Sequence, residues 1–260
     1  MSPPPSTVGT ATETELKLLL PGSDPAFIAD QLGRHPLLCR RLRTVQRLHN
    51  QYFDTPGQDL RQRKVALRVR RIDGQGDAAS PRWVQTLKTA GVSIGGMSRR
   101  GEWESDIDGP SPQLAALAGS PWPEIDADGT LWSCLGPAFV TECTRSLWTV
   151  RRRGRIEIEV ALDVGEIRAG DTRQSLCELE LELKHGHPDA LLALAMELAR
   201  ALPLLPGQAS KAERGYALAA GLDRQPRRAA PPALPGRMPL RAAAQAVLSE
   251  AWDQTQRNLA

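Results

Sequence analysis

A two-residue alternation of charged and uncharged side chains is the feature that most constrains this fold. In the stretch ETELK, Glu13, Glu15 and Lys17 lie on one side of an extended chain, and Thr14 and Leu16 lie on the other. Successive side chains of a β-strand point to opposite faces, so this alternation predicts a strand with one charged and one mostly apolar face.

The same alternation returns in later stretches of the chain. The charged residues that share a face are Lys64, Arg68 and Arg70; Arg100, Glu102, Glu104 and Asp106; Glu157, Glu159 and Asp163; and Glu178, Glu180, Glu182 and Lys184. For any single strand, a charged face is most simply the solvated side of a sheet. Aligned acids repel one another, however, and like charges on neighbouring strands are destabilising. Bound cations, and the bases of other strands, would offset that repulsion.

The order of the strand-like and helix-like segments predicts the fold class. Strands are predicted at 12–20, 43–55, 64–73, 82–90, 99–107, 139–152, 154–167 and 177–186, and helices at 24–35, 188–202 and 210–221. The stretches DGQGD and GVSIGG are typical of turns between strands. We therefore predict an α+β, mainly β fold, with an eight-stranded antiparallel β-barrel whose charged faces line a wet tunnel and whose apolar faces lie under covering helices.

The composition divides the 260 residues into four segments. Residues 1–11 are rich in Pro, Ser and Thr and are expected to be disordered. Residues 12–222 form the predicted tunnel domain, and 223–238 form a linker rich in Pro and Arg. Residues 239–260 form a predicted amphipathic helix, which either packs back on the barrel or begins a second domain.

Composition and charge argue against several classes of protein. Hydrophobic residues make up 41% and charged residues 24%, as in ordinary soluble globular proteins, and the net charge is only +3. No basic patch for nucleic acid is evident, and the four dispersed cysteines indicate neither a zinc site nor a disulfide framework. No signal peptide or membrane span is predicted, so we expect a cytoplasmic protein with no nucleic-acid or membrane partner.

The mixture of acids and bases on the tunnel-facing positions indicates a chemistry. Carboxylates without neighbouring His or Cys ligands suit a hard divalent cation, Mg²⁺ or Mn²⁺. Arg and Lys side chains in the same interior suit a polyanion that carries several phosphates. Together they favour phosphoryl chemistry.

These residues also resemble a known family. The matching motifs, in chain order, are ETELK at 13–17, YFDT at 52–55, ALRVR at 66–70, LK at 87–88, RGEWE at 100–104, EVALDVGEI at 159–167, CELELELK at 177–184 and SKAERGY at 210–216. The series resembles the CYTH superfamily, the triphosphate tunnel metalloenzymes, and is most similar to bacterial inorganic triphosphatases that carry a C-terminal helical CHAD domain. The predicted helix at 239–260 resembles the first helix of that domain, whose remainder this chain lacks.

The resemblance implies roles for individual residues. Glu13, Glu15 and Lys17 would be catalytic. The implied metal ligands are Glu13, Glu15, Glu102, Glu104, Glu159, Asp163, Glu178, Glu180 and Glu182, and the implied phosphate contacts are Arg68, Arg70, Lys88, Arg100, Arg145, Lys184, Lys211 and Arg214. The implied cofactor is Mg²⁺ or Mn²⁺.

Three functions remain open from the sequence. The first is metal-dependent hydrolysis of inorganic tripolyphosphate to pyrophosphate and phosphate. The second keeps the fold but takes another triphosphate: a nucleoside triphosphate, thiamine triphosphate, or ATP converted to cyclic AMP. The third is a polyphosphate-binding module without catalysis. A homodimer is an open alternative to a monomer, and the number of metals is likewise open.

Overall fold

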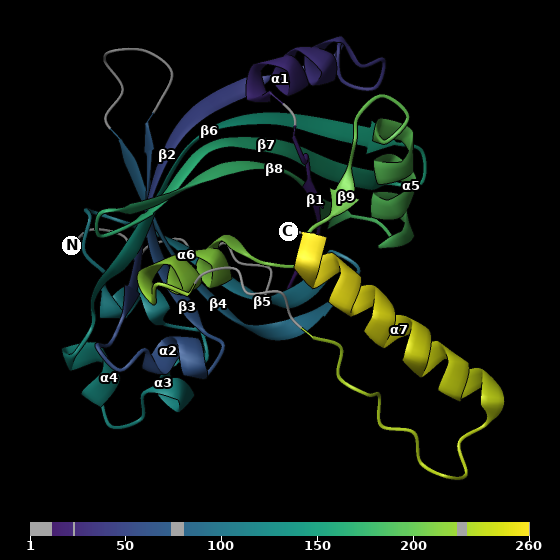
Figure 1. Cartoon of the computed structure of the whole chain (residues 1–260). Helices are drawn as coiled ribbons and strands as arrows, with labels where there is room; N and C mark the ends of the chain where they lie inside the picture. Colours follow the sequence, from purple (N-terminus) through teal and green to yellow (C-terminus); the bar gives the residue numbers. More distant parts are fainter. Residues whose placement is uncertain (1–11, 23, 74–80, 223–227, 260) are drawn as a thin grey trace.

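The computed structural model describes residues 12–22, 24–73, 81–222 and 228–259, and its main feature is a closed antiparallel β-barrel (Figure 1). The barrel strands are β1 (Glu13–Leu19), β2 (Thr44–Asp54), β3 (Ala66–Asp73), β4 (Arg82–Ile94), β5 (Met97–Ile107), β6 (Gly136–Arg152), β7 (Ile156–Ala169) and β8 (Thr172–His185). They pair in the order β5-β4-β3-β2-β6-β7-β8-β1, and β1 also pairs with β5, which closes the sheet. The predicted eight-stranded barrel is confirmed. A two-residue strand, β9 (Leu205–Pro206), adds to the end of β1.

The alternation in β1 determines which side chains face the tunnel. Leu16 and Leu18 are 2% and 4% exposed and belong to an apolar core on the outer surface of the barrel. Glu13, Glu15 and Lys17 lie on the opposite face, where each meets charged groups from other strands. The charged face of the strand therefore points inward and the leucines point outward.

Two sets of helices cover the apolar outer faces. One set is α1 (Pro25–Arg34) and α5 (Asp189–Leu198), which bury Ile28, Leu32 and Leu194 against β1 and β6–β8. The other set is α2 (Asp59–Gln62), η1 (Leu114–Leu117), α3 (Trp122–Ile125) and α4 (Thr130–Ser133), which pack with the outer residues of β3–β5. Asp24 caps α1, because its Oδ1 accepts a hydrogen bond from the Ala26 amide at 3.2 Å.

The helix α6 (Lys211–Ala219) packs against β6, β7 and β8 beside the barrel interior (Figure 1). Its first turn is fixed by a capping box between Ser210 and Glu213. The ring of Tyr216 meets Phe139 edge-on at 5.0 Å, and Phe139 stacks on Tyr52 at 4.4 Å. Gly215 lies so close to Phe139 that an added Cβ would be 2.1 Å from its ring. The helix is therefore docked tightly, with its first residue, Lys211, close to the tunnel.

The structure differs from the sequence prediction at several places. The predicted turn GVSIGG is mostly strand: β4 runs to Ile94, and the turn is made by Gly95 and Gly96 at positive φ (60° and 83°). A two-residue Gly-Gly connection of this kind suits a tight hairpin. Lys64 lies in a turn before β3 and has a φ of 56°, so it does not share the charged face of that strand. The short helices η1, α3 and α4 occupy a stretch for which the sequence predicted no element.

The C-terminal helix α7 (Leu240–Leu259) lies within the range predicted for it. It contacts the segment before α6 through a hydrogen bond of 3.0 Å, which the side-chain amide of Gln208 donates to the carboxylate of Asp253. Leu240, Leu248 and Trp252 remain exposed on it. The segment 1–11, the turn DGQGD after its first residue, and the first part of the predicted linker lie outside the described residues.

The described part of the chain contains no helix with the length and apolarity of a membrane span.

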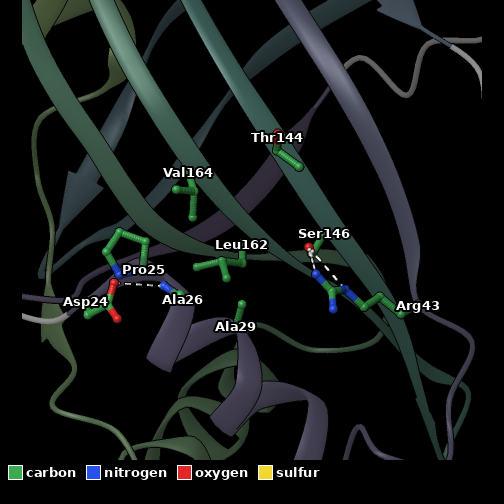
Figure 2. Close-up of a pocket in the computed structure, with 9 residues that line it drawn as sticks. All are labelled: Asp24, Pro25, Ala26, Ala29, Arg43, Thr144, Ser146, Leu162 and Val164. Carbon is green, nitrogen blue, oxygen red and sulfur yellow. Dashed lines mark hydrogen bonds between the residues drawn. The ribbon is translucent and has the colours of Figure 1, made fainter.

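A cavity of about 410 Å³ lies between α1 and the outer faces of β6 and β7 (Figure 2). Leu162 and Val164 contribute apolar side chains, and the Arg43 guanidinium borders it while donating to the Ser146 hydroxyl at 2.8 and 3.2 Å. None of the tunnel-facing acids or bases lines it. The cavity belongs to the outer packing of α1, and the charged interior is the candidate functional site.

Candidate functional site

The charged side chains of the tunnel divide into two groups of ion pairs. The base-rich group consists of Asp163, Glu178 and Glu180 with Lys17, Lys211, Arg145 and Arg214. The acid-rich group consists of Glu13, Glu15, Glu102, Glu159 and Glu182 with Lys88, Arg100 and Lys184. Both groups draw residues from several strands, which the alternation brings to a common interior.

Lys17 is at the centre of the base-rich group. Its Nζ lies 3.0 Å from Glu178 Oε1 and 2.9 Å from Glu180 Oε1, and the residue is 4% exposed. Burial disfavours the charged form, but the two carboxylates outweigh burial and raise the pKa of Lys17 above its usual value. The lysine is therefore a fixed ammonium ion.

Asp163 has the most complete set of partners in this group. The Arg145 guanidinium donates to its two oxygens at 2.7 and 2.6 Å, and Lys211 Nζ lies 2.8 Å away. Burial raises the pKa of this fully buried carboxyl, but Arg145 and Lys211 more than reverse that effect and hold it well below the usual range. Asp163 is ionised and already neutralised by bases.

Helix α6 adds two further bases to the group. Lys211, its first residue, contacts Glu178 and lies 2.8 Å from Glu180 Oε1. Arg214, one turn later, lies 3.2 Å from Glu178 Oε2. The docking of α6 therefore places two cations against the acids of β8.

The acid-rich group begins at the first strand. Glu13 lies 2.9 Å from Lys88 and 3.0 Å from Arg100, and Glu15 lies 2.9 Å from Arg100. The hydroxyl of Ser98 also donates to Glu15 at 3.2 Å. Lys88 is shared between Glu13 and Glu102, at 2.9 and 3.0 Å. One base thus serves two acids.

Glu182 shares a base in the same way. Lys184 Nζ lies 2.5 Å from Glu182 and 3.2 Å from Glu159. Burial raises the pKa of Glu182 to about 7; Lys184 opposes this rise, and the charges of Glu13 and Glu102 add to it. The raised pKa therefore reflects burial first, and neighbouring negative charge adds to it.

The two groups differ in charge balance. In the acid-rich group five carboxylates face three bases, which leaves two negative charges when all are ionised. In the base-rich group three carboxylates face four bases, which leaves one positive charge. A divalent cation would neutralise the acid-rich group. In the base-rich group it would add positive charge to a group that is already positive.

Two arginines on β3 complete the interior. Arg68 donates to Thr86 at 2.8 Å and contacts Glu104 at 3.3 Å, but its buried Nε has no hydrogen-bond partner among the described residues. Arg70 donates from Nε to the Asn50 side-chain oxygen at 2.7 Å, and among the described residues no carboxylate lies within ion-pair distance of it. Both guanidinium groups therefore keep N–H donors for a further acceptor.

The carboxylates of the tunnel suit a hard cation, but the most closely spaced of them already surround lysine ammonium groups. Among the described residues, the group of acids with ligand oxygens within 4.8 Å of one another is Asp163, Glu178 and Glu180. Lys17 and Lys211 occupy the space between them. The acid-rich group is more open and consists of carboxylates alone, the ligands that Mg²⁺ and Mn²⁺ prefer.

The structure brings the predicted site residues into one interior but to different depths. Glu104 and Lys184 have side chains 41% and 37% exposed, whereas Glu178 is fully buried. Asp106 and Glu157, which are not among the predicted site residues, pair with the exposed Arg82 and Arg151. The individual roles as metal ligands and phosphate contacts stay predictions.

The sequence analysis missed the neutral partners of the charged groups. These are Asn50, Thr86, Thr141, Ser98 and Gln174, which hydrogen-bond to tunnel residues or to one another. Strand parity could have found Asn50, since it lies opposite Arg70 once β2 and β3 are paired, but the register was not known.

A closed eight-stranded antiparallel barrel with an interior of paired acids and bases defines a class of tunnel-shaped domains. The chain belongs to the CYTH domain family, whose family model matches residues 11–216.

Comparison with known proteins finds relatives of this class. An inorganic triphosphatase of Haemophilus influenzae is 34% identical over 173 residues, which cover 66% of this chain and 46% of that protein. The chain thus spans about half the length of this relative. A second similar protein is HpAC1 from Hippeastrum, whose solved structure is described as a candidate adenylyl cyclase with a dominant triphosphatase activity. It is 21% identical to this chain, and the two align with a TM-score of 0.52 over 78% of this chain and 94% of HpAC1. The PH1819 protein of Pyrococcus horikoshii is 18% identical, with a TM-score of 0.47 over 77% and 97%. The Hippeastrum likeness supports the barrel fold.

Proposed function

We propose that this chain hydrolyses inorganic tripolyphosphate to pyrophosphate and phosphate inside its tunnel, with the help of Mg²⁺ or Mn²⁺. The observation that carries the proposal is the pair of the buried Arg68 and the part-buried Arg70, whose guanidinium groups have donors left over among the described residues, in an interior where the other bases are paired with acids. A buried cation without a full set of partners is costly, and a phosphate oxyanion would relieve that cost. The 34% identity to an inorganic triphosphatase supports the same substrate class.

Binding and positioning are the main contributions of the protein in this proposal. Arg68, Arg70 and Arg145 would hold phosphate oxygens, and Lys17 would offer its ammonium from a position fixed by Glu178 and Glu180. Fixed cations that face a developing negative charge stabilise a phosphoryl-transfer transition state without reorganisation. The tunnel-facing thiol of Cys143 is an unsuitable nucleophile, because burial raises its pKa to about 12.

The charge balance favours the acid-rich group as the metal site. We place Glu13, Glu15 and Glu182 nearest the ion, because Glu15 and Glu182 are cross-strand neighbours and Glu13 acts on the Glu182 carboxyl. A bound Mg²⁺ or Mn²⁺ would neutralise charge on the reacting phosphate oxygens. Asp163, Glu178 and Glu180, which the family resemblance also suggests as ligands, are proposed instead to hold Lys17 and Lys211 in place.

Phosphate release from tripolyphosphate, measured with and without Mg²⁺ or Mn²⁺, tests the proposed activity. We expect metal-dependent release by the wild-type chain and a loss of at least about 100-fold in the double variant Glu13→Gln/Glu15→Gln, by analogy with removal of a transition-state contact. The matched control is Glu157→Gln, a strand acid outside both groups that pairs with the exposed Arg151 and should leave activity unchanged. Absence of metal-dependent release, or full activity in the double variant, contradicts the proposal.

The same assay separates the alternative functions. Faster turnover of ATP than of tripolyphosphate would favour a nucleoside triphosphate as substrate. Tight binding of long-chain polyphosphate in EDTA, with no turnover of any substrate, would favour a binding module.

A further inference from the structure

Asn50 is a buried neutral residue in the middle of the charged tunnel. It lies on β2 opposite Thr141 of β6 and Arg70 of β3, and it is 2% exposed. Its Nδ2 donates to the Thr141 hydroxyl at 3.0 Å and to the Thr141 carbonyl at 3.2 Å. Because a carbonyl only accepts, the amide nitrogen must face Thr141, so the oxygen must face Arg70. The Arg70 Nε donates to that oxygen at 2.7 Å.

The neutrality of this partner distinguishes Arg70 from the other tunnel bases. Lys17, Lys88 and Arg100 each lie within 3.0 Å of carboxylate oxygens. Even Arg68 has a carboxylate at 3.3 Å. Arg70, in the described part of the chain, is oriented only by an amide, and it lies in the field of Arg68 and Arg145. Burial and these two positive charges lower the pKa of Arg70 to about 10, although the charge of Glu104 opposes the fall, so it is still a cation at neutral pH.

We propose that Asn50 is a positioning residue that orients Arg70 without neutralising it, so that the Arg70 guanidinium presents its full charge and its terminal N–H groups to an oxyanion of the phosphate substrate. This inference rests on the proposed function and extends it to a residue outside the charged motifs. An aspartate at position 50 would have almost the same shape and would hold the guanidinium more strongly. It would also cancel the charge that the substrate needs, and so compete with it.

The arrangement makes the empty tunnel less stable and the occupied tunnel more stable. Three arginines close together repel one another, and a carboxylate at position 50 would reduce that repulsion. A neutral amide leaves the repulsion in place until an anion arrives. Selection for anion binding, rather than for stability of the empty barrel, explains an amide here.

The test compares Asn50→Asp with wild type in two measurements. The first is binding of tripolyphosphate in EDTA by calorimetry, and the second is KM and kcat for tripolyphosphate with Mn²⁺. We expect Asn50→Asp to weaken binding and to raise KM by at least about tenfold, since the new carboxylate would offset the charge of Arg70 and compete with the substrate for its N–H groups. The matched control is Gln85→Glu. Gln85 is a buried amide on the outer face of β4 that also donates to a main-chain carbonyl, that of Gln113 at 3.0 Å. The Gln85→Glu variant should bind tripolyphosphate as tightly as the wild-type chain does.

A double-mutant cycle separates positioning from a general structural defect. Arg70→Gln should weaken binding, and Asn50→Asp should add little in the Arg70→Gln background, because Asn50 acts through Arg70. Asn50→Ser, which keeps a neutral hydroxyl, should bind more tightly than Asn50→Asp, and Asn50→Leu should lose binding. If Asn50→Asp does not fold, the comparison of Ser with Leu at this position decides instead.

The results that overturn the inference differ from those that overturn the proposed function. Wild-type affinity in Asn50→Asp, or losses that add fully with Arg70→Gln, would overturn the role of Asn50. A chain that binds tripolyphosphate, loses that binding in Asn50→Asp, and hydrolyses nothing would support Asn50 and refute the hydrolase.

Discussion

The base-rich and acid-rich groups use the same residue types in the same tunnel, yet they differ in what they can accept. In the base-rich group, Asp163 and Glu178 are fully buried and each contacts two or more cations. In the acid-rich group, only three bases serve five acids, and Lys88 and Lys184 are each divided between two of them. The base-rich group keeps one positive charge, and the acid-rich group has negative charge to spare. The comparison teaches that the ratio of bases to acids, and not the density of acids, indicates where a cation would bind.

The largest expected effect is on stability, in the base-rich group. Asp163→Asn would leave Arg145 and Lys211 without their shared carboxylate, and loss of one partner of a buried ion pair costs about 3–5 kcal/mol. Urea unfolding monitored by circular dichroism measures this change. The control is Asp106→Asn, whose exposed pair with Arg82 contributes at most about 1 kcal/mol. Near-wild-type stability in Asp163→Asn together with loss of metal response would instead make Asp163 a metal ligand.

The next effect is the response to metal, which should belong to the acid-rich group. Mn²⁺ at about 100 times its Kd stabilises a folded protein by about 2.7 kcal/mol, and this should appear as a higher melting temperature in the wild-type chain. Glu15→Gln should remove most of that increase, whereas Lys211→Met, in the base-rich group, should keep it. A wild-type metal response in Glu15→Gln, or its absence in Lys211→Met, would reverse the assignment of the two groups.

Gly215→Ala tests whether the docking of α6 completes the base-rich group. The new Cβ would lie 2.1 Å from the Phe139 ring, and overpacking of this kind costs about 1–3 kcal/mol. Displacement of α6 would carry Lys211 and Arg214 away from Glu178 while leaving the acid-rich group in place. The control Gly33→Ala, in α1 with nothing within 4 Å, should stabilise the protein by about 0.5–1 kcal/mol. Unchanged stability and activity in Gly215→Ala would mean that the helix can shift without consequence.

The smallest expected effect is a pH dependence in the acid-rich group without metal. The pKa of Glu182 is raised from its usual value near 4.5 to about 7, so between these values the folded state binds more protons than the unfolded state. The free energy of unfolding in EDTA should therefore fall as pH rises from about 4.5 to 7. The side chain is 28% exposed, so solvent moderates the effect. In Glu182→Gln the slope over this range should be shallower, and an equal slope in both proteins would rule out Glu182 as its source.

Most of the barrel could be predicted from the sequence, because the alternation is a local property. A period of two fixes which residues share a face, and the apolar faces rule out exposure of both sides of the sheet. The helices α1, α5 and α6 carried local signals too: a cap at Asp24, an apolar stripe, and the Ser210 capping box. The short helices over β3–β5 carried no such signal, since one-turn helices are stabilised by their tertiary contacts rather than by their own sequence.

The sequence by itself therefore determined the strands, their inward charged faces and the candidate residues for a polyanion and a hard cation. Only the tertiary structure decided which acid meets which base. Pairing depends on strand register and on the docking of α6, and both bring together residues far apart in the chain, such as Lys17 with Glu178 and Arg70 with Asn50. Electrostatic energy depends on distance and burial, and neither can be read from sequence spacing. For this reason the role of the neutral Asn50 became visible only once the register of β2 against β3 and β6 was known.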